Sequence, residues 1–223
     1  MHMIARYDFE GDSNIGAFGI ATDRYVFISP NMSERSIETM ERVFNLPLVQ
    51  STIATLDVIG LVCVANSNGI LLPYTASDEE LAALKEYSDI RVDWIDDKMT
   101  ALGNIILAND NGAICHPDFD KNARTKISDA LDVEVIPGTV ANLPTVGSNT
   151  ATTNQGAIVH PMATTSEIEK ISQLLKVHVE VGTVNRGSPY TSLGVMANMD
   201  SMIVGSETTG VELAHISQVL GFV

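Results

Sequence analysis

Five glycines at nearly equal spacing are the feature that most constrains the fold of this 223-residue chain. They follow one another at intervals of 44, 43, 44 and 47 residues, and each opens a similar segment. These glycines are Gly16, Gly60, Gly103, Gly147 and Gly194. A period of this length is typical of repeat architectures, in which neighbouring units bury their apolar surfaces against one another. The spacing therefore predicts five units.

Each unit contains the signals of two strands, a helix and a third strand. In the first four units a proline follows the glycine by 13 or 14 residues, and Gly205 takes that place in the fifth. Between glycine and proline, two apolar segments flank a polar turn, as at residues 66–69, 109–112 and 153–156. Asn and Gly in such turns favour hairpins. After the proline, apolar residues recur at helical spacing, for example Ile168, Ile171 and Leu175.

The starts of the expected helices carry capping signals. Three Ser or Thr residues precede a Glu by three positions, the pattern in which each partner satisfies a free backbone donor of the other. The pairs are Ser77 with Glu80, Ser166 with Glu169, and Thr209 with Glu212. Asp120 is expected to cap the helix of the third unit.

A third strand is expected over residues 90–94, 133–136 and 177–181, with Val177, Val179 and Val181 on one face. The fifth unit ends at Val223, directly after its helix, and lacks this strand. Residues 4–9 alternate in β fashion and belong to no complete unit. We expect them to fill the vacant place, because an open sheet edge is a pairing liability.

The predicted fold is α/β: five strand-strand-helix-strand repeats in a closed pseudo-fivefold ring, sealed by the N-terminal strand. It forms one domain over residues 1–223, although Met1 and His2 receive no structural weight. The repeats cover about 14–58, 59–101, 102–145, 146–192, and 193–223 plus 3–12. A helix in every repeat argues against a propeller of four-stranded blades.

Composition excludes several function classes. The chain has 13 Lys plus Arg against 28 Asp plus Glu, a net charge of −15 at pH 7, so it is not a general nucleic-acid binder and any RNA contact is local. No apolar stretch approaches the roughly 18 residues that span a bilayer, and no secretion signal is apparent, so we expect a cytoplasmic protein. The only cysteines, Cys63 and Cys115, lie among apolar residues and fit reduced, buried thiols.

The sequence offers little catalytic chemistry. It contains no phosphate-binding loop, dinucleotide fingerprint, paired-cysteine motif or zinc-protease motif, and we expect no catalytic residue, metal or cofactor. His116 and His160 both precede the unit proline, a repetition that favours a packing role over catalysis. The alternative is a guanidino-group hydrolase or amidinotransferase, since such enzymes share a ring of five units, but they need a nucleophilic Cys in the last unit and no cysteine follows Cys115.

Small polar residues gather at the junctions between units, which pseudo-symmetry places on one rim. They include Asn104, Asn149, Asn185 and Arg186. Turn geometry alone explains many Asn and Gly residues at such places. Arg186 meets no turn requirement and offers a planar fork for carboxylate or phosphate, which makes it the strongest single candidate for a contact residue.

Several segments of the chain resemble the archaeal translation initiation factor 6 family, and the resemblance extends over residues 3–223. The most specific segments are Asn14-Ile15-Gly16, Ala101-Leu102-Gly103-Asn104-Ile105, His116-Pro117-Asp118, Asn154-Gln155-Gly156, and residues 182–188. The resemblance implies a pentein fold around a central channel, no catalysis, and an archaeal origin.

The same resemblance implies a steric function. Members of the family bind the large ribosomal subunit on its intersubunit face, near the sarcin-ricin loop and a small ribosomal protein, and block joining of the small subunit; a role in large-subunit biogenesis is possible. It implies ribosome contacts for Asn104, Asn185 and Arg186, and junction symmetry adds Asn149. We expect a monomer that docks mainly on basic ribosomal protein, with limited rRNA contact and no DNA or membrane partner.

Overall fold

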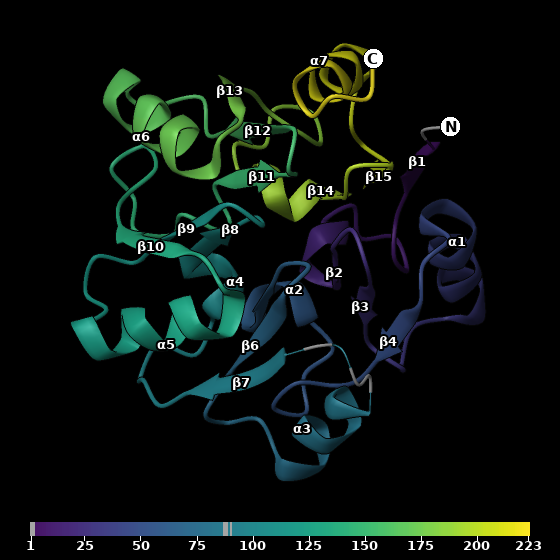
Figure 1. Ribbon diagram of the computed structural model, residues 1–223. Coiled ribbons are helices and arrows are strands. Elements are labelled where there is room, and N and C mark those ends of the chain that lie inside the picture. Colours follow the sequence, from purple (N-terminus) through teal and green to yellow (C-terminus); the bar gives the residue numbers. More distant parts are fainter. Residues whose placement is uncertain (1–2, 87–88, 90) are drawn as a thin grey trace.

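The computed structural model describes residues 3–86, 89 and 91–223. Within them, the strands form five three-stranded sheets arranged around a central axis, and the long helices lie on the outside of the ring (Figure 1). The predicted closed ring of five α/β units is therefore confirmed. The strand predicted from residue 90 is observed from Arg91, and residue 90 lies outside the described residues, as do Met1 and His2.

The sheets follow the order of the chain. The first contains β2 (Gly19–Ala21), β3 (Val26–Ile28) and β4 (Leu48–Gln50). The second contains β5 (Val64–Ala65), β6 (Gly69–Pro73) and β7 (Arg91–Ile95). The third contains β8 (Ile106–Ala108), β9 (Gly112–Cys115) and β10 (Glu134–Pro137). The fourth contains β11 (Thr150–Thr152), β12 (Gly156–Val159) and β13 (His178–Val181). The fifth contains β14 (Val195–Ala197), β15 (Ser201–Gly205) and β1 (Met3–Tyr7).

The helices fall into two groups. The long outer helices are α1 (Glu34–Phe44), α3 (Asp78–Lys85), α5 (Lys121–Leu131), α6 (Thr165–Leu175) and α7 (Gly210–Val219). The short ones, near the centre of the ring, are η1 (Ile15–Ala17), α2 (Ile59–Val62), α4 (Leu102–Ile105) and η2 (Thr191–Gly194). Each outer helix buries its apolar stripe against strands, as where Ile127 and Leu131 of α5 cluster with Leu71 of β6 and Ala113 of β9. This cluster spans two units, so neighbouring repeats share a core.

Every sheet has the same topology. The first and second strands form an antiparallel hairpin, and the third runs parallel to the second. In the third unit, Ile106 of β8 lies opposite Cys115 of β9, and Gly112 of β9 lies opposite Glu134 of β10. The predicted hairpin turns are confirmed. The strand predicted at 177–181 is also present, but its last residue, Val181, is exposed because the strand ends there.

The N-terminal strand closes the ring. β1 pairs in parallel with β15, from Met3 opposite Ser201 to Tyr7 opposite Gly205. It thereby supplies the third strand that the fifth unit lacks, as the sequence predicted. The strand ends at Tyr7, two residues before the predicted end, because Phe9 turns away to form an isolated bridge with Asp12.

The repeating glycines are required where backbones meet around the channel. A Cβ on Gly60 would lie 1.9 Å from the carbonyl oxygen of Gly16, and one on Gly103 would lie 2.0 Å from that of Gly60. A Cβ on Gly147 would in turn lie 2.0 Å from the carbonyl oxygen of Gly103. No side chain fits at these contacts, so the 44-residue spacing reflects backbone packing between units.

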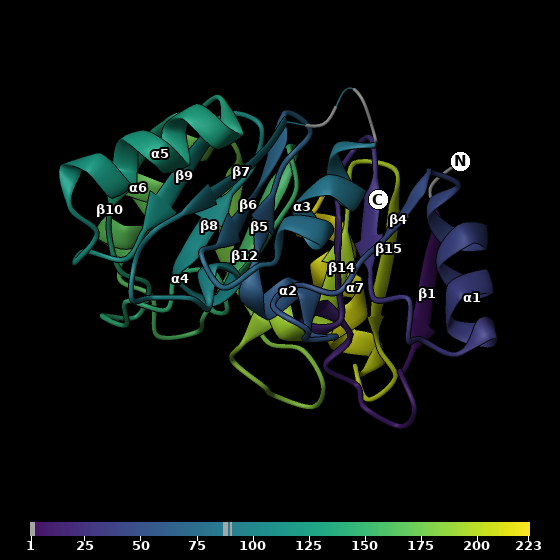
Figure 2. The same cartoon turned by 90° about the horizontal axis from the view of Figure 1, so that it is seen from below.

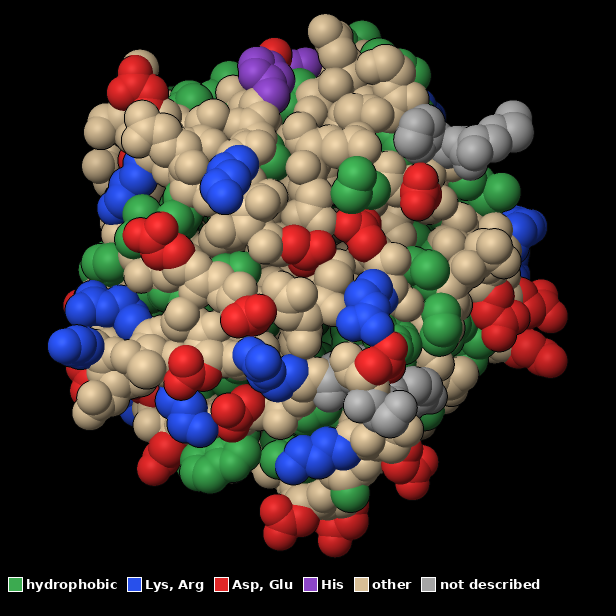
Figure 3. Space-filling view, in the orientation of Figure 1, with side chains coloured by type: hydrophobic (Ala, Val, Ile, Leu, Met, Phe, Trp, Pro, Cys, Tyr) green, Lys and Arg blue, Asp and Glu red, His purple; other side chains and the backbone are tan. Residues whose placement is uncertain are grey.

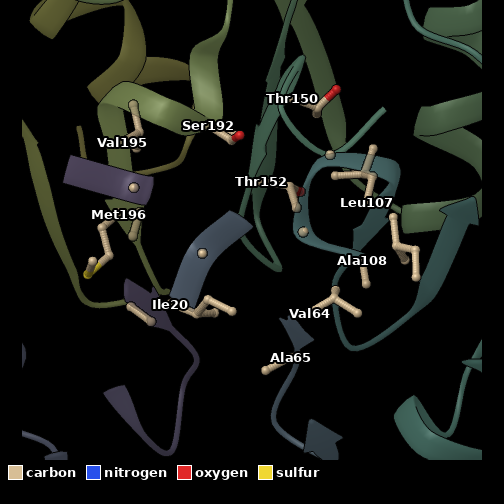
Figure 4. A pocket seen from close by; sticks show the side chains of 18 of the residues that line it. Ile20, Val64, Ala65, Leu107, Ala108, Thr150, Thr152, Ser192, Val195 and Met196 are labelled. Carbon is tan, nitrogen blue, oxygen red and sulfur yellow. The ribbon is translucent and has the colours of Figure 1, made fainter. Parts of the chain in front are cut away.

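A small cavity of about 130 Å³ lies on the axis of the ring. Figure 4 shows the side chains of Thr150, Thr152 and Ser192 on one side of it and those of Ile20 and Val64 on the other. Val195 lies beside Ser192 and Leu107 beside Thr150, so the wall of the channel mixes polar and apolar side chains.

The helix caps agree with the sequence in three cases and correct it in one. Ser77 with Glu80 and Thr209 with Glu212 form capping boxes, and Asp120 accepts a hydrogen bond from the backbone of Ala123. The predicted pair Ser166 and Glu169 is wrong, because the box of α6 is formed by Thr164 and Glu167. Both pairs have a Ser or Thr three positions before a Glu. Glu167 is the one that also accepts hydrogen bonds from the turn at 140–143.

Candidate binding face of the ring

The turns of the chain lie at two opposite ends of the strands. One set connects the first and second strands of each unit, at residues 22–25, 66–69, 109–112, 153–156 and 198–201, and we call this end the hairpin face. The other set connects consecutive units, at residues 9–12, 53–56, 140–143 and 184–188, and we call this end the junction face. Figure 2 shows the long yellow-green loop that precedes β14 at the bottom of the ring, on the same side as α2 and α4.

Side chains of the hairpin face are occupied by contacts between units. The Asn66 amide donates to the carbonyl oxygens of Asn109, at 3.2 Å, and Leu131, at 2.8 Å. The Asn109 amide repeats this one unit later, donating to the carbonyl oxygens of Thr153, at 3.3 Å, and Leu175, at 3.0 Å. Both Asn side chains are buried. They connect adjacent units rather than offering groups to a partner.

The mouth of the channel on the hairpin face is held in the same way. Asn154 donates to the carboxylates of Asp23 and Asp110, each at 2.7 Å. The other oxygens of these carboxylates accept backbone N–H groups, from Met199 and Ser67 respectively, each at 2.8 Å. Around this mouth, Lys and Arg side chains are interspersed with Asp and Glu over the face (Figure 3).

The junction face is built on glutamates at the starts of helices. Glu212, in the first turn of α7, accepts five hydrogen bonds. Two come from the backbone of the turn before the fifth unit, from Gly187 at 2.8 Å and Arg186 at 3.2 Å. The others come from the Thr183 hydroxyl at 2.9 Å and from the Thr209 backbone and hydroxyl, both at 2.8 Å. Partial burial opposes ionisation, but the donors outweigh it and lower the pKa of Glu212 from 4.5 to about 2.

The same arrangement recurs in two other units. Glu80 accepts hydrogen bonds from the backbones of Ala54 and Thr55, and Glu167 accepts them from the backbones of Ala141 and Asn142. Donors again outweigh desolvation, so both glutamates have lowered pKa values. These contacts link residues about 26 positions apart, so the capping pattern in the sequence indicated only half of their role.

Arg186 lies at the most prominent of these turns. The residue is exposed and has a left-handed backbone, with φ of 61°. Among the described residues, its guanidinium makes no ion pair. The prediction that Arg186 has no role in a turn is corrected, because it occupies a turn position that Gly or Asn adopts at a lower cost, by roughly 1–2 kcal/mol. Thr55 and Asn142 have the same left-handed conformation in two other turns, and the Arg186 side chain is open to solvent.

Asn185 is engaged within the protein. Its amide nitrogen donates to the carbonyl oxygen of Ser13 at 2.8 Å, and its amide oxygen accepts from the Thr208 hydroxyl at 3.0 Å. The side chain is half-buried and ties the turn before the fifth unit to the junction after β1. Asn185 therefore shapes the loop that presents Arg186.

Asn104 and Asn149 differ from each other. Asn104 lies on α4, is half-buried, and makes no side-chain hydrogen bond to any described residue, although its carbonyl oxygen accepts from Gly147 and Ser148. Asn149 is fully buried, and its amide donates to the Thr145 hydroxyl at 3.0 Å. The expectation that Asn149 lies on the rim is corrected, because Ser148 takes the position equivalent to Asn104 and the next residue turns inward.

Large apolar side chains are exposed on the junction face, and the sequence analysis did not find them. They are Leu56, Tyr74, Leu143, Met162 and Tyr190, with exposed fractions between 39% and 73%. Tyr74 and Met162 directly follow the unit prolines, where the turn faces solvent, and that position was the available signal. Tyr, Met and Arg are enriched in protein interfaces, so these exposed side chains are candidate contacts.

The two cysteines and the two histidines before the unit prolines have structural surroundings. Burial raises the pKa of Cys115 to about 11 and that of Cys63 further, so both remain neutral thiols at physiological pH. The Nδ1 atoms of His116 and His160 each accept a backbone N–H two residues on, at 3.1 and 3.0 Å. The described residues contain no group of three or more His, Cys, Asp or Glu side chains placed to hold a metal ion. No helix among the described residues has both the length and the apolar character of a membrane span.

Comparison with known proteins identifies the family of the chain. A model of the eIF-6 family matches residues 4–219. The chain belongs to the eIF-6 family. Among similar members, translation initiation factor 6 of Pyrococcus furiosus is 44% identical and that of Methanocaldococcus jannaschii 37% identical, each over the full length of both chains. The factor of Sulfolobus acidocaldarius is 38% identical over 93% of this chain and 94% of its own.

Two solved structures share the pentein fold of this eIF-6 family member. A dimethylarginine dimethylaminohydrolase adduct with S-methyl-L-thiocitrulline superimposes with a TM-score of 0.53 at 13% identity, covering 76% of this chain and 69% of that one. A mutant of DDAH from Pseudomonas aeruginosa complexed with citrulline gives a TM-score of 0.51 at 15% identity, with the same coverage. At this identity the likeness concerns the fold alone.

Proposed function

We propose that this eIF-6 family member binds the large ribosomal subunit through its junction face and sterically prevents the small subunit from joining. The observation that carries the proposal is the contrast between the two faces. On the hairpin face, the Asn side chains of the turns and the carboxylates at the channel mouth bond between units, whereas the junction face presents the Arg186 guanidinium and several exposed apolar side chains. Asn104 lies at the start of the third unit on the same face and joins Arg186 as a proposed contact.

Charge supports a basic protein as the main docking partner. The chain carries a net charge of −15, so phosphate-rich RNA repels most of its surface and a basic ribosomal protein attracts it. We place the contact on the intersubunit face near the sarcin-ricin loop, with Arg186 as the limited rRNA contact. Binding then weakens as salt is added and survives competition by bulk RNA, and capture of the protein by free RNA contradicts this arrangement. The protein acts as a monomer in the cytoplasm, where subunits join.

The proposed role requires no catalysis. The two thiols are buried and neutral, so neither supplies the thiolate that guanidino-group chemistry of this fold needs. Incubation with arginine, agmatine or dimethylarginine is expected to give no product. Release of citrulline or an amine above the level of a heat-denatured control would favour the hydrolase alternative.

Co-sedimentation with purified large subunits tests the proposal. The protein is expected to pellet with large subunits, and Arg186→Ala is expected to weaken this binding about tenfold, as for an arginine near the centre of an interface. Arg42→Ala removes the same charge from the last turn of α1 and serves as the matched control. Equal binding by all three proteins would remove Arg186 from the contact, and failure of the unmodified protein to pellet would refute the proposed function.

A further inference from the structure

The first unit lacks the glutamate that three other units place on a junction turn. At the position of Glu80, Glu167 and Glu212, the third residue of the helix, α1 has Ser36. The Ser36 hydroxyl is short and bonds to the Tyr7 hydroxyl at 3.2 Å, so it does not reach the turn at 9–12. The repeat therefore leaves unfilled the space that a glutamate side chain takes elsewhere.

A cavity of about 330 Å³ occupies this place, between the start of α1 and the turn at 9–12. Its inner part is apolar and its outer part is acidic. Phe9 is buried and Phe18 and Met32 are half-buried, while three carboxylates lie on exposed residues of the lining. These carboxylates belong to Glu10, Asp12 and Asp57.

Two of the carboxylates are held in place by hydrogen bonds. Asp57 Oδ1 accepts hydrogen bonds from the Ser29 hydroxyl at 2.5 Å and the Asn31 amide at 2.9 Å, which lower the pKa of Asp57. Asp12 Oδ1 accepts from the backbone and the amide of Asn14, at 2.8 and 3.0 Å. Within the described residues these bonds use only Oδ1 of each carboxylate, which leaves Oδ2 for a further donor. No lysine or arginine among the described residues lines the cavity.

We propose that this cavity receives an arginine side chain from a basic segment of a protein partner. A planar guanidinium stacks on aromatic rings such as Phe9 and Phe18 and donates in pairs to carboxylates such as Asp12 and Asp57. The acidic lining disfavours an anionic occupant. A neutral apolar occupant gives no donor to the Oδ2 atoms of Asp12 and Asp57. The cavity adjoins a junction turn, and the junction face is the one proposed to dock on the large subunit. The inference therefore rests on the proposed function and names the chemistry of one contact.

Titration with a small probe tests the cavity without ribosomes. N-acetyl-arginine methylamide is added to the isotopically labelled protein and followed by NMR. Saturable shifts are expected at the amides of Phe18, Met32 and Ser36. Neutral N-acetyl-norleucine methylamide is expected to bind at least tenfold more weakly. Shifts spread over the surface, or equal binding of both probes, would overturn the proposal.

Paired variants connect the cavity to the partner. Asp57→Asn keeps the size of the side chain and removes its charge, and is expected to weaken probe binding and large-subunit binding about fivefold each. Glu38→Gln removes one charge from an exposed position on α1 and is expected to change neither.

The outcomes separate the two claims. Large-subunit binding unchanged by Asp57→Asn would overturn the inference while leaving the proposed function intact. Failure of the unmodified protein to bind large subunits would refute the proposed function, and the probe titration would still decide whether the cavity takes a guanidinium.

Discussion

Replacing Glu212 by Gln is expected to destabilise the protein by about 2 kcal/mol. The carboxylate accepts five hydrogen bonds, and an amide in its place puts an NH₂ group against backbone N–H donors. Lowering the pKa from 4.5 to about 2 corresponds to roughly 3 kcal/mol, at about 1.4 kcal/mol per unit. The side chain is partly open to solvent, and screening reduces this to about 2 kcal/mol.

Urea unfolding followed by circular dichroism measures the effect, with Glu207→Gln, at an exposed residue close by in the chain, as the control. Because the folded-state pKa is lowered, the stabilisation is present above pH 4.5 and is lost as pH falls toward about 2. The difference between the unmodified protein and the Glu212→Gln variant is therefore expected to shrink across this window. A difference below 0.5 kcal/mol at pH 7, or one that does not change with pH, would refute the reasoning.

Three further predictions concern the ring. Gly103→Ala puts a methyl group 2.0 Å from the Gly60 carbonyl oxygen and is expected to cost about 3 kcal/mol, seen as a lower melting temperature in calorimetry; an unchanged value would contradict backbone packing around the channel. Removal of residues 1–8 exposes the edge of β15 and is expected to cause aggregation in size-exclusion chromatography, whereas a monodisperse folded product would argue against closure by β1. Cys63 and Cys115 are expected to resist a thiol reagent until the protein is unfolded, so rapid labelling of the native protein would contradict their burial.

The fold followed from local and periodic features of the sequence. The glycine spacing reflects a backbone contact that recurs from Gly16 to Gly60, Gly103 and Gly147. The hairpin turns and caps are set by residues close in the chain. Closure by β1 was predictable because the fifth unit lacks a third strand after its helix, while an additional strand precedes the first unit. The error at α6 arose where Thr164 and Ser166 both precede a glutamate by three residues. The contact of Glu167 with residues 139–142 decides between them, and it exists only in the folded ring.

The candidate site was less predictable. The sequence pointed to Arg186 as unusual, and the structure places it exposed at a left-handed turn. The burial of Asn149 could not be predicted from the sequence. The direction of a side chain one residue beyond a junction depends on packing against Thr145 and the neighbouring unit. Among the exposed apolar side chains, only Tyr74 and Met162 carried a local signal, their place directly after the unit prolines. The cavity beside α1 combines residues from distant segments, so no local pattern indicated it.

Subunit joining in the presence of the protein tests the central claim most directly. Purified large subunits are mixed with increasing protein, small subunits are added, and association is followed by light scattering. We predict that joining falls to near zero at about one protein per large subunit, and that Arg186→Ala shifts this curve to higher concentration. Full joining on large subunits that have the protein bound would contradict steric exclusion.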